Sequence, residues 1–263
     1  MPEISILMSI YNTKNKDYLK KSLSSIFNQS FQDFELIIYD DGSTNDCFNW
    51  VKDICKNRNN VIFLHSDENK GLAHALNCCL KVSRGKYIAR MDDDDFCSLD
   101  RLSKQLNFLK NNNFDLVTCN VNLFDDRGIY SRIIRKSSIC KEDFLKNSPI
   151  THAAIVAKKY CFDIVNGYNE EKICCRVEDY DLFMRMFAKG VKMYNLEECL
   201  YNWRLDKDAY KRRQIFKYRI NEFLIRVRGF RLLGLYPKGL IYIFKPIILS
   251  IIPIRIFNKM RKS

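Results

Sequence analysis

Four consecutive aspartates follow an apolar run in the segment ARMDDDDFCSLDRL, residues 89–102. Adjacent carboxylates repel one another, so a protein normally disperses or neutralises such charge. Side chains of an extended chain alternate between two faces, so Asp92 and Asp94 share one face and Asp93 points away. Two carboxylates that converge in this way are typical of Mg²⁺ or Mn²⁺ sites that also bind substrate phosphates. An exposed acidic turn is the alternative, and the four aspartates alone do not decide between them.

A second acidic group, Glu178, Asp179 and Asp181, lies in the segment VEDYDLFMRM. Acidic residues in the first turn of a helix stabilise its dipole and cap its amino terminus. Taken alone, this segment is therefore best explained as an ordinary helix start. Arg185 lies one helical turn beyond Asp181, so these two side chains can form an ion pair.

Short apolar runs alternate with amphipathic stretches along most of the chain. The pattern predicts strands at 4–11, 34–43, 61–66 and 86–91, and helices at 17–30, about 43–57 and 71–83. Such alternation favours a mostly parallel sheet with helices on both faces. Ligands of these sheets bind beyond the carboxyl ends of the strands, where Asp40, Asp41 and the run from Asp92 to Asp95 lie. The pair of Asp40 and Asp41 and the run from Asp92 to Asp95 are therefore expected to face one crevice.

The composition is that of a folded protein kept in a reducing compartment. The chain has 263 residues, of which 47% are hydrophobic, so it can bury a sizeable core. Its eleven cysteines include no CxxC pair, which is typical of reduced thiols. The amino-terminal segment MPEISILMSIYN opens on a strand pattern without a basic leader, so a cytoplasmic protein is expected.

The positive charge is concentrated in the carboxyl-terminal part of the chain. Residues 204–263 contain sixteen Lys and Arg against three acids, and this difference equals the net charge of +13 of the whole chain. A boundary near residue 204 is therefore expected between a neutral body and a basic tail.

Apolar residues are interleaved with the basic ones in this tail. Residues 210–234 show a helical pattern, and its apolar positions are Ile215, Ile220, Phe223, Leu224 and Val227. Residues 240–260 are apolar but interrupted by charge and proline, too short for the about 20 residues of a spanning helix. Together these features predict a segment that lies in the interface of an anionic membrane. A helical cap on the core is the alternative, and RNA binding is disfavoured because no RNA-binding motif is present.

Eight sequence blocks together resemble a known family. In order they are SILMSIYN, SIFNQSFQDFELIIYDDGS, NKGLAHALN, GKYIARMDDDD, LDRLSKQLNFL, HAAIVAKK, NGYNE and VEDYDLFMRM. The set closely resembles the family 2 inverting glycosyltransferases of bacterial O-antigen, capsule and exopolysaccharide synthesis, and it covers roughly residues 3–204. The resemblance implies the α/β GT-A fold, a nucleotide-diphospho-sugar transferase fold with a nucleotide-sugar half at about 1–95 and an acceptor half at about 96–204. Residues 205–263 are then a basic amphipathic helical tail.

The resemblance assigns the donor site. Asp41 matches the aspartate that binds the uracil edge, and a carboxylate suits the N3–H donor of that base. Tyr11 matches an aromatic residue that stacks on the base, although a tyrosine at a strand end is more often part of the core. Asp92 and Asp94 match the DxD motif, so Asp92 and Asp93 are expected at the nucleotide-sugar, and Asp94 with Asp92 at Mn²⁺ or Mg²⁺.

The resemblance also assigns the acceptor side. Asp179 matches the general base of an inverting displacement, in which one carboxylate takes the proton of the acceptor hydroxyl. Glu178, Asp181 and Arg185 are expected to support it. His152 matches a family histidine near the acceptor or the metal, although a lone histidine is more often structural.

Two departures from the family pattern matter. Leu76 stands where the family often has an arginine that contacts the diphosphate, and His74 and Arg90 are candidate replacements. No QxxRW follows the acidic helix start, so transfer of one sugar rather than processive synthesis is expected.

The expected function is metal-dependent, inverting transfer of one sugar from a nucleotide-sugar, UDP-linked hexose or N-acetylhexosamine, to a lipid-linked saccharide. The expected partners are an undecaprenyl-diphosphate saccharide and an anionic membrane surface, without nucleic acid, on the cytoplasmic face of the inner membrane. A nucleotidyltransferase is one alternative, but SIYNTKNKDYL lacks the glycine of a phosphate loop. A degenerate transferase that only binds or regulates at the membrane is the other.

Overall fold

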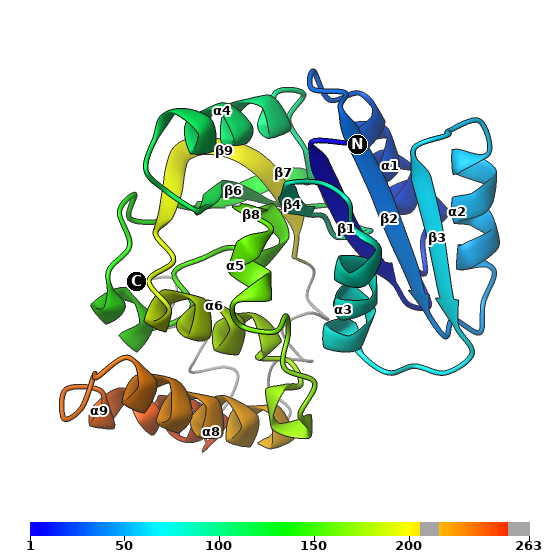
Figure 1. Ribbon diagram of the computed structural model, residues 1–263. Helices are drawn as coiled ribbons and strands as arrows, with labels where there is room; N and C mark the ends of the chain where they lie inside the picture. The colour runs from blue at the N-terminus through cyan, green and yellow to red at the C-terminus, as the bar shows by residue number, and fades with distance from the viewer. Residues whose placement is uncertain (206–215, 252–263) are drawn as a thin grey trace.

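The computed structural model describes residues 1–205 and 216–251. Figure 1 shows a central sheet with helices on both of its faces. Within the described residues nine strands pair in the order β3-β2-β1-β4-β8-β6-β9-β5, and β7 pairs with β6. The predicted α/β architecture is confirmed.

The amino-terminal half of the sheet is parallel. Its strands are β1 (Ile4–Ile10), β2 (Phe34–Asp41), β3 (Val61–Ser66) and β4 (Tyr87–Arg90). The crossover helices are α1 (Lys16–Phe27), α2 (Cys47–Cys55) and α3 (Leu72–Val82). Because parallel neighbours need such crossovers, the alternation of apolar runs and amphipathic stretches predicted this half correctly.

The carboxyl-terminal half of the sheet is mixed. Its strands are β5 (Phe96–Cys97), β6 (Leu116–Asp125), β7 (Gly128–Ile133), β8 (Val156–Lys158) and β9 (Met193–Arg204). β6 and β9 are parallel, whereas β8 is antiparallel to β4 and β6, and β5 is antiparallel to β9. β7 forms a tight hairpin with β6, which needs no crossover helix. The expectation of a mostly parallel sheet therefore holds only for the first half.

Two hydrophobic layers enclose the sheet. α1, α2 and α4 (Arg101–Asn111) pack on one face, against the alternate residues Ile4, Ile6 and Met8 of β1. α3, α5 (Tyr160–Asp163) and α6 (Glu178–Ala188) pack on the other, where Leu7 points. Three short 3₁₀ turns lie in the connections, η1 (Lys141–Leu145), η2 (His152–Ala154) and η3 (Lys172–Cys174).

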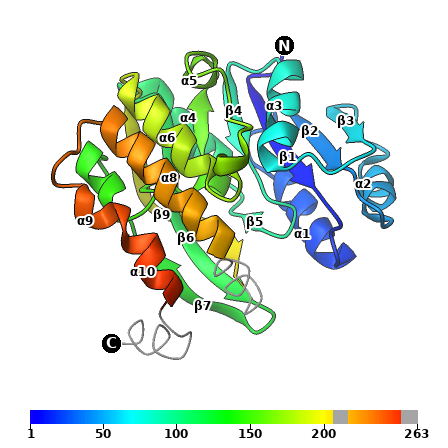
Figure 2. The ribbon, with the colours of Figure 1, turned by 90° about the horizontal axis from the view of Figure 1, so that it is seen from below.

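The described part of the basic tail caps the second layer. It contains α8 (Phe216–Leu232), α9 (Leu240–Ile243) and α10 (Lys245–Ile251), and Figure 2 shows α8 lying alongside α6. Ile225 and Phe230 are fully buried in the same cluster as the core residues of α6. The guanidinium of Arg226, also fully buried, donates to the carbonyls of Leu145 at 2.8 Å and Lys146 at 3.0 Å. The described helices that follow the predicted boundary near residue 204 therefore share one hydrophobic core with the body of the protein.

Some of the tail predictions lie outside the described residues. These are the positions in 206–215 and 252–263, which include Ile215, Pro253 and Arg255. Among the residues that the structure describes, no helix is both long enough and apolar enough to cross a bilayer.

Candidate active site

The acidic run begins where β4 ends, and a buried cation neutralises its first member. Arg90 is the last residue of β4 and only 2% exposed, and its guanidinium donates to the Asp92 carboxylate at 2.5 Å. Arg101 of α4 donates to the backbone carbonyl of Arg90 at 2.9 Å, and this bond helps to hold Arg90 in position beside Asp92. The sequence suggested Arg90 only as a phosphate contact, and in the structure its charge is directed at Asp92.

Two other aspartates of the run, Asp93 and Asp95, hold the loop after β4 in place through hydrogen bonds. Asp95 is buried and accepts hydrogen bonds from the Tyr201 hydroxyl at 2.8 Å and the Arg204 backbone N–H at 2.6 Å. Asp93 accepts a hydrogen bond from the hydroxyl of Thr13, which lies in the loop after β1. These contacts bind the loop after β4 to β9 on one side and to β1 on the other.

The chemistry of Asp94 fits a divalent cation. Burial, with the charges of Asp93 and Asp92, raises the pKa of Asp94 to about 7, and burial with the charge of Asp92 raises that of Asp93 to about 6. Burial is the main cause of both shifts and the charges of neighbouring aspartates add to it, so a bound cation would favour the ionised carboxylates. In residues 1–205 and 216–251, no three His, Cys, Asp or Glu side chains gather to hold a metal by themselves. Since Mg²⁺ usually keeps waters and substrate phosphates as ligands, Asp94 with Asp92 suits a cation that arrives with a diphosphate.

Tyr11 and Asp41 lie at the carboxyl ends of β1 and β2. Tyr11 is 51% exposed, so the alternative that it belongs to the core is wrong. Asp41 is buried, and its carboxylate accepts hydrogen bonds from the Asn69 side chain at 2.9 Å and the backbone N–H groups of Lys70 at 2.9 Å and Gly71 at 2.8 Å. Asp41 therefore holds the loop before α3 against the end of β2.

Glu178 and Asp179 open α6. The Asp179 carboxylate accepts the backbone N–H of Tyr180 at 2.8 Å. Burial, with the charge of Asp179, raises the pKa of Glu178 to about 7. Burial lowers the pKa of Arg135, while the negative charge of Asp179 raises it. Arg135 therefore lies close enough to Asp179 for their charges to interact.

Arg135 is a site residue that the sequence did not reveal. It follows β7, and its guanidinium donates to the Thr151 hydroxyl at 3.2 Å and the Ser148 carbonyl at 2.8 Å. Thr151 immediately precedes His152, so the same short segment carries a predicted site residue and positions this cation. No local pattern marks Arg135, because its contacts depend on how the loop folds back.

His152 and Tyr168 lie between the two acidic groups. The His152 Nε2 atom is 2.7 Å from the Tyr168 hydroxyl, and burial and the charge of Arg90 lower the pKa of His152 well below its usual range. Burial raises the pKa of Tyr168, opposed by the charge of Arg90 and reinforced by those of Asp179, Glu178 and Asp92. Tyr168 therefore lies within electrostatic reach of Asp92 from the acidic run and of Glu178 and Asp179 from the start of α6, which the fold brings together.

Asp181 and Arg185 form the predicted ion pair, with Arg185 Nε donating to Asp181 at 2.6 Å. Asp181 is 3% exposed, so it is a structural carboxylate inside the protein. Arg185 also donates to the carbonyls of Val165 at 2.7 Å and Gly167 at 3.1 Å. Both residues thus connect α6 with the segment that leads into it.

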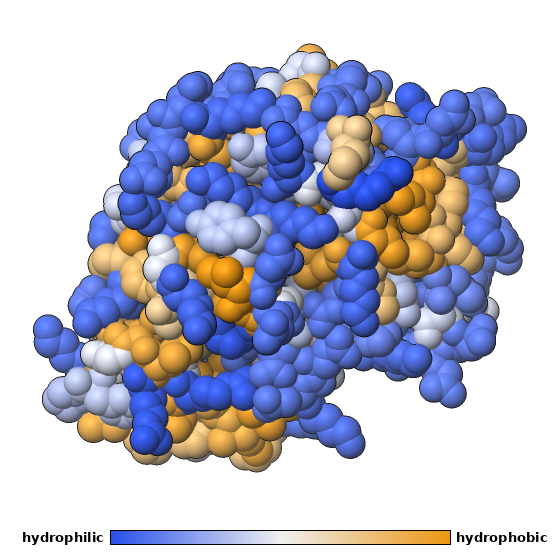
Figure 3. Space-filling model, in the orientation of Figure 1, coloured by the Kyte–Doolittle hydropathy of each residue, from blue (hydrophilic) through white to orange (hydrophobic). Residues whose placement is uncertain are grey.

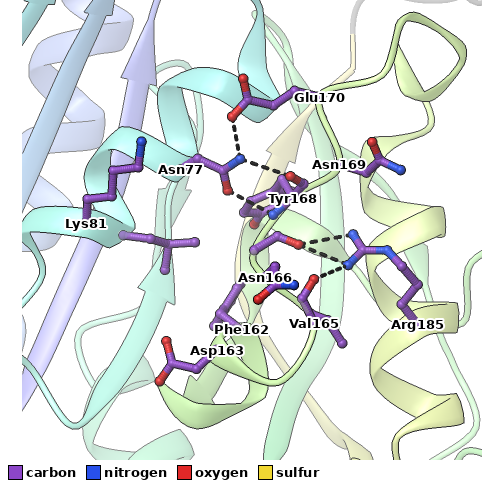
Figure 4. Close-up of a pocket in the computed structure, with 12 residues that line it drawn as sticks. Asn77, Lys81, Phe162, Asp163, Val165, Asn166, Tyr168, Asn169, Glu170 and Arg185 are labelled. Carbon is purple, nitrogen blue, oxygen red and sulfur yellow. Dashed lines mark hydrogen bonds between the residues drawn. The ribbon is translucent and has the colours of Figure 1, made fainter.

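A pocket of about 770 Å³ lies where this segment meets α3 (Figure 4). The Asn77 side chain bonds both backbone groups of Tyr168, donating to its carbonyl at 2.9 Å and accepting its N–H at 2.8 Å. The Glu170 carboxylate is 2.9 Å from His74 Nδ1 and also accepts from Asn77 at 2.6 Å. These contacts join the half of the molecule that carries Asp41 to the half that carries Asp179.

The same contacts bear on the departures from the family pattern. Leu76 is fully buried and cannot contact a diphosphate in this conformation. His74 is bonded to Glu170, and Arg90 is bonded to Asp92, so both candidate replacements already have carboxylate partners within the protein.

A family model describes more than half of the chain. Residues 5–160 match the model of glycosyl transferase family 2. The chain belongs to this family. It is a glycosyltransferase, and the family expected from the sequence blocks is confirmed.

Two curated relatives match nearly the whole transferase. EpsE of Bacillus subtilis, which carries a provisional glycosyltransferase name, is 35% identical over 264 aligned residues, covering 100% of this chain and 94% of EpsE. The second is an Escherichia coli β-1,3-galactosyltransferase named for UDP-Gal and α-D-GlcNAc-diphosphoundecaprenol. It is 31% identical over 236 residues, which cover 88% of this chain and 84% of that enzyme.

A solved structure gives the fold of the transferase. S. aureus TarS, crystallised with UDP-GlcNAc, superposes with a TM-score of 0.72 at 17% identity. The match covers 93% of this chain and 73% of TarS. The GT-A fold predicted from the sequence is confirmed.

The raised pKa of Glu178 predicts a pH-dependent stability. A carboxyl group that holds its proton more tightly when folded favours folding while it is protonated, and this contribution is lost as the pH rises to 7 and above. Glu178→Gln stays neutral, so we expect its melting temperature to gain on the wild type between pH 5 and pH 8, by on the order of 4 °C. Thermal unfolding at several pH values measures this gain.

The control for this experiment is Glu142→Gln, which removes an exposed carboxylate in η1. Its difference from the wild type should not change between pH 5 and pH 8. An equally constant difference for Glu178→Gln would show that the pKa of Glu178 is not raised.

Proposed function

We propose that this transferase moves one sugar, with inversion, from a UDP-linked hexose or N-acetylhexosamine to an undecaprenyl-diphosphate-linked saccharide. The product is an intermediate of a bacterial surface polysaccharide. The reaction depends on Mn²⁺ or Mg²⁺ and takes place on the cytoplasmic face of the inner membrane. The E. coli relative, whose name contains both a UDP-sugar and a diphosphoundecaprenol acceptor, supports this choice of substrates.

The observation that carries this proposal is the position of Tyr168. Charges of Asp92 from the loop after β4, and of Glu178 and Asp179 from the start of α6, all act on its hydroxyl. A single-displacement transfer needs these two sets of acids on opposite sides of one anomeric carbon. In the proposed complex, the donor acids lie on one side of the transferred sugar and the base lies on the other.

In the proposed donor complex, the exposed ring of Tyr11 stacks on uracil and the Asp41 carboxylate accepts the N3–H of the base. Asp41 already organises the loop 69–71, so donor binding and loop position are linked through one side chain. Asp92 and Asp93 face the ribose and diphosphate, and Asp94 with Asp92 holds the cation. The cation, when bound, neutralises negative charge that develops on the leaving diphosphate.

In the proposed transfer, Asp179 takes the proton from the acceptor hydroxyl. The hydroxyl oxygen forms a bond with the anomeric carbon from the face opposite the phosphate, while the bond from that carbon to the diphosphate oxygen breaks. The products are the inverted glycoside, UDP and a proton on Asp179. Arg135 lies close enough for its positive charge to interact with the negative charge of Asp179.

Membrane association is supported by the outer face of the tail. Large apolar side chains of α8 to α10 are exposed there, namely Ile220, Leu224, Val227, Leu240, Ile241, Phe244 and Ile248. Figure 3 shows apolar residues gathered along the lower edge of the molecule, where α8 and α9 lie in Figure 1. Lys217, Arg231 and Lys238 are exposed among them, so this face combines the apolar and cationic groups that an anionic lipid surface attracts.

A first test concerns the metal. Asp94→Ala removes the proposed cation ligand, so turnover should fall to background while the unfolding midpoint stays near that of the wild type. Excess EDTA should have the same effect on the wild type, and added Mn²⁺ or Mg²⁺ should restore activity. Asp53→Ala, which removes an exposed carboxylate from α2, is the matched control. Full activity in EDTA would contradict a metal-dependent mechanism.

A second test concerns the base. Asp179→Asn is nearly isosteric but cannot take up the acceptor proton, so the chemical step should slow by at least about a hundredfold. Donor affinity, measured by titration with UDP-sugar, should remain unchanged. A variant that turns over near the wild-type rate would move the base to Glu178, the neighbouring carboxylate.

A third test concerns the membrane. The double substitution Ile241→Asp and Ile248→Asp places charges on side chains that are 76% and 54% exposed, so it should spare the fold. We expect at least a tenfold loss of binding to phosphatidylglycerol-containing vesicles in a sedimentation assay. Ile134→Asp changes an equally exposed isoleucine (66%) outside the tail and serves as control. Unchanged sedimentation of the double variant would exclude this face as the membrane contact.

A further inference from the structure

The carboxylate of Asp181 is held from two sides. Arg185 of the same helix donates to Oδ2 at 2.6 Å, and Arg228 of α8 donates to Oδ1 at 2.6 Å. Only 4% of the Asp181 side chain is exposed, so water competes little for either bond. Asp181 lies in the first turn of α6, two residues after Asp179, and the two arginines therefore fix the turn that carries the proposed base.

Arg228 also reaches the segment that leads into α6. Its guanidinium donates to the Glu171 carboxylate at 3.0 Å and lies 3.1 Å from the sulfur of Cys174. Asn221, two turns earlier on α8, donates to the backbone carbonyls of Lys172 at 3.3 Å and Cys175 at 3.0 Å. The residues immediately before Glu178 are thus attached to α8 at several points.

A glycine of α8 lies against α6 beside Arg228. A Cβ atom built on Gly229 would lie 2.2 Å from the sulfur of Met184 on α6, far inside van der Waals contact. The side chain of Met184 therefore occupies the space next to Gly229, so α6 and α8 are in direct contact one residue away from Arg228.

We propose that Arg228 is a positioning residue for sugar transfer. By holding Asp181 and the segment before α6, it orients the Asp179 carboxylate toward the acceptor hydroxyl. This inference rests on the proposed role of Asp179 as the base. It makes α8 part of the catalytic machinery whatever the acceptor, in addition to any contact that its outer face makes with lipid.

The test compares Arg228→Met with Arg132→Met in the full-length protein. Arg132 is an exposed residue of β7, so its replacement removes the same charge without touching Asp181. With a short, soluble saccharide analogue as acceptor, kcat of Arg228→Met should fall at least tenfold, since small misplacements of a catalytic group cost about 100-fold. The KM for the UDP-sugar should stay within twofold of the wild type, and Arg132→Met should match the wild type in both kcat and KM.

Two further variants separate positioning from general destabilisation. Arg228→Lys keeps the positive charge and one donor nitrogen, so its kcat should lie between those of the wild type and Arg228→Met. Asp181→Asn combined with Arg228→Met should lower kcat by less than the product of the two single effects, because the two changes share the Arg228–Asp181 contact. If Arg228→Met proves too unstable to assay, Arg228→Lys and Asp181→Asn alone decide the matter, since both must then lower kcat at an unchanged donor KM.

The outcomes distinguish this inference from the proposed function. A wild-type kcat for Arg228→Met, or for Arg228→Lys and Asp181→Asn where Arg228→Met cannot be assayed, overturns the positioning role. If Asp179→Asn is inactive in that case, the proposed base is unaffected. An active Asp179→Asn variant instead refutes the proposed base, and the inference about Arg228 with it.

Discussion

A buried arginine offsets the negative charge of the acidic run after β4. Arg90 is 2% exposed, and a charge in such a place is strongly unfavourable unless it is paired. The Asp92 carboxylate pairs with it, and Arg101 bonds its backbone carbonyl. Its positive charge also acts on His152, whose lowered pKa keeps the imidazole neutral at physiological pH. Arg90 thus offsets part of the negative charge that four consecutive aspartates place after β4.

The position of α6 depends on parts of the chain that are distant in sequence. From α3, Asn77 bonds both backbone groups of Tyr168, and from α8, Arg228 bonds Asp181. The family match covers residues 5–160, which include the expected nucleotide-sugar half and part of the expected acceptor half. Asp179 and its supports follow the matched segment. The part beyond the match contains α6 and the helix that holds it.

The helix α8 has two different faces. Ile225, Arg226 and Phe230 are fully buried against the core, whereas Leu224 and Val227 are exposed on the other side. A sequence pattern of mixed basic and apolar residues cannot distinguish a membrane contact from a cap on the core, because both require an apolar stripe. Here the cap is observed on one face, and the membrane contact is proposed for the other. The observed cap and the proposed membrane contact therefore concern different sides of one helix.

The sequence by itself determined the features that depend on local periodicity. The apolar runs ISILMSI and FELIIYDD predicted buried strands with Tyr11 and Asp41 at their carboxyl ends, where the structure has them. The run KYIARM likewise placed the four aspartates after a third strand. The i,i+4 spacing likewise predicted the pair of Asp181 and Arg185.

Only the tertiary structure decided which side chains meet across the chain. Asp95 bonds Tyr201 at a separation of 106 residues, and Arg228 bonds Asp181 at a separation of 47. Neither separation corresponds to a helical or strand repeat, so no local sequence pattern predicts these contacts. The mixed order of the second half of the sheet was missed for the same reason, since strand pairing there follows from hairpins and packing. Helical and strand periods are encoded over a few residues, whereas the partner of a buried charge is fixed by the closure of the whole fold.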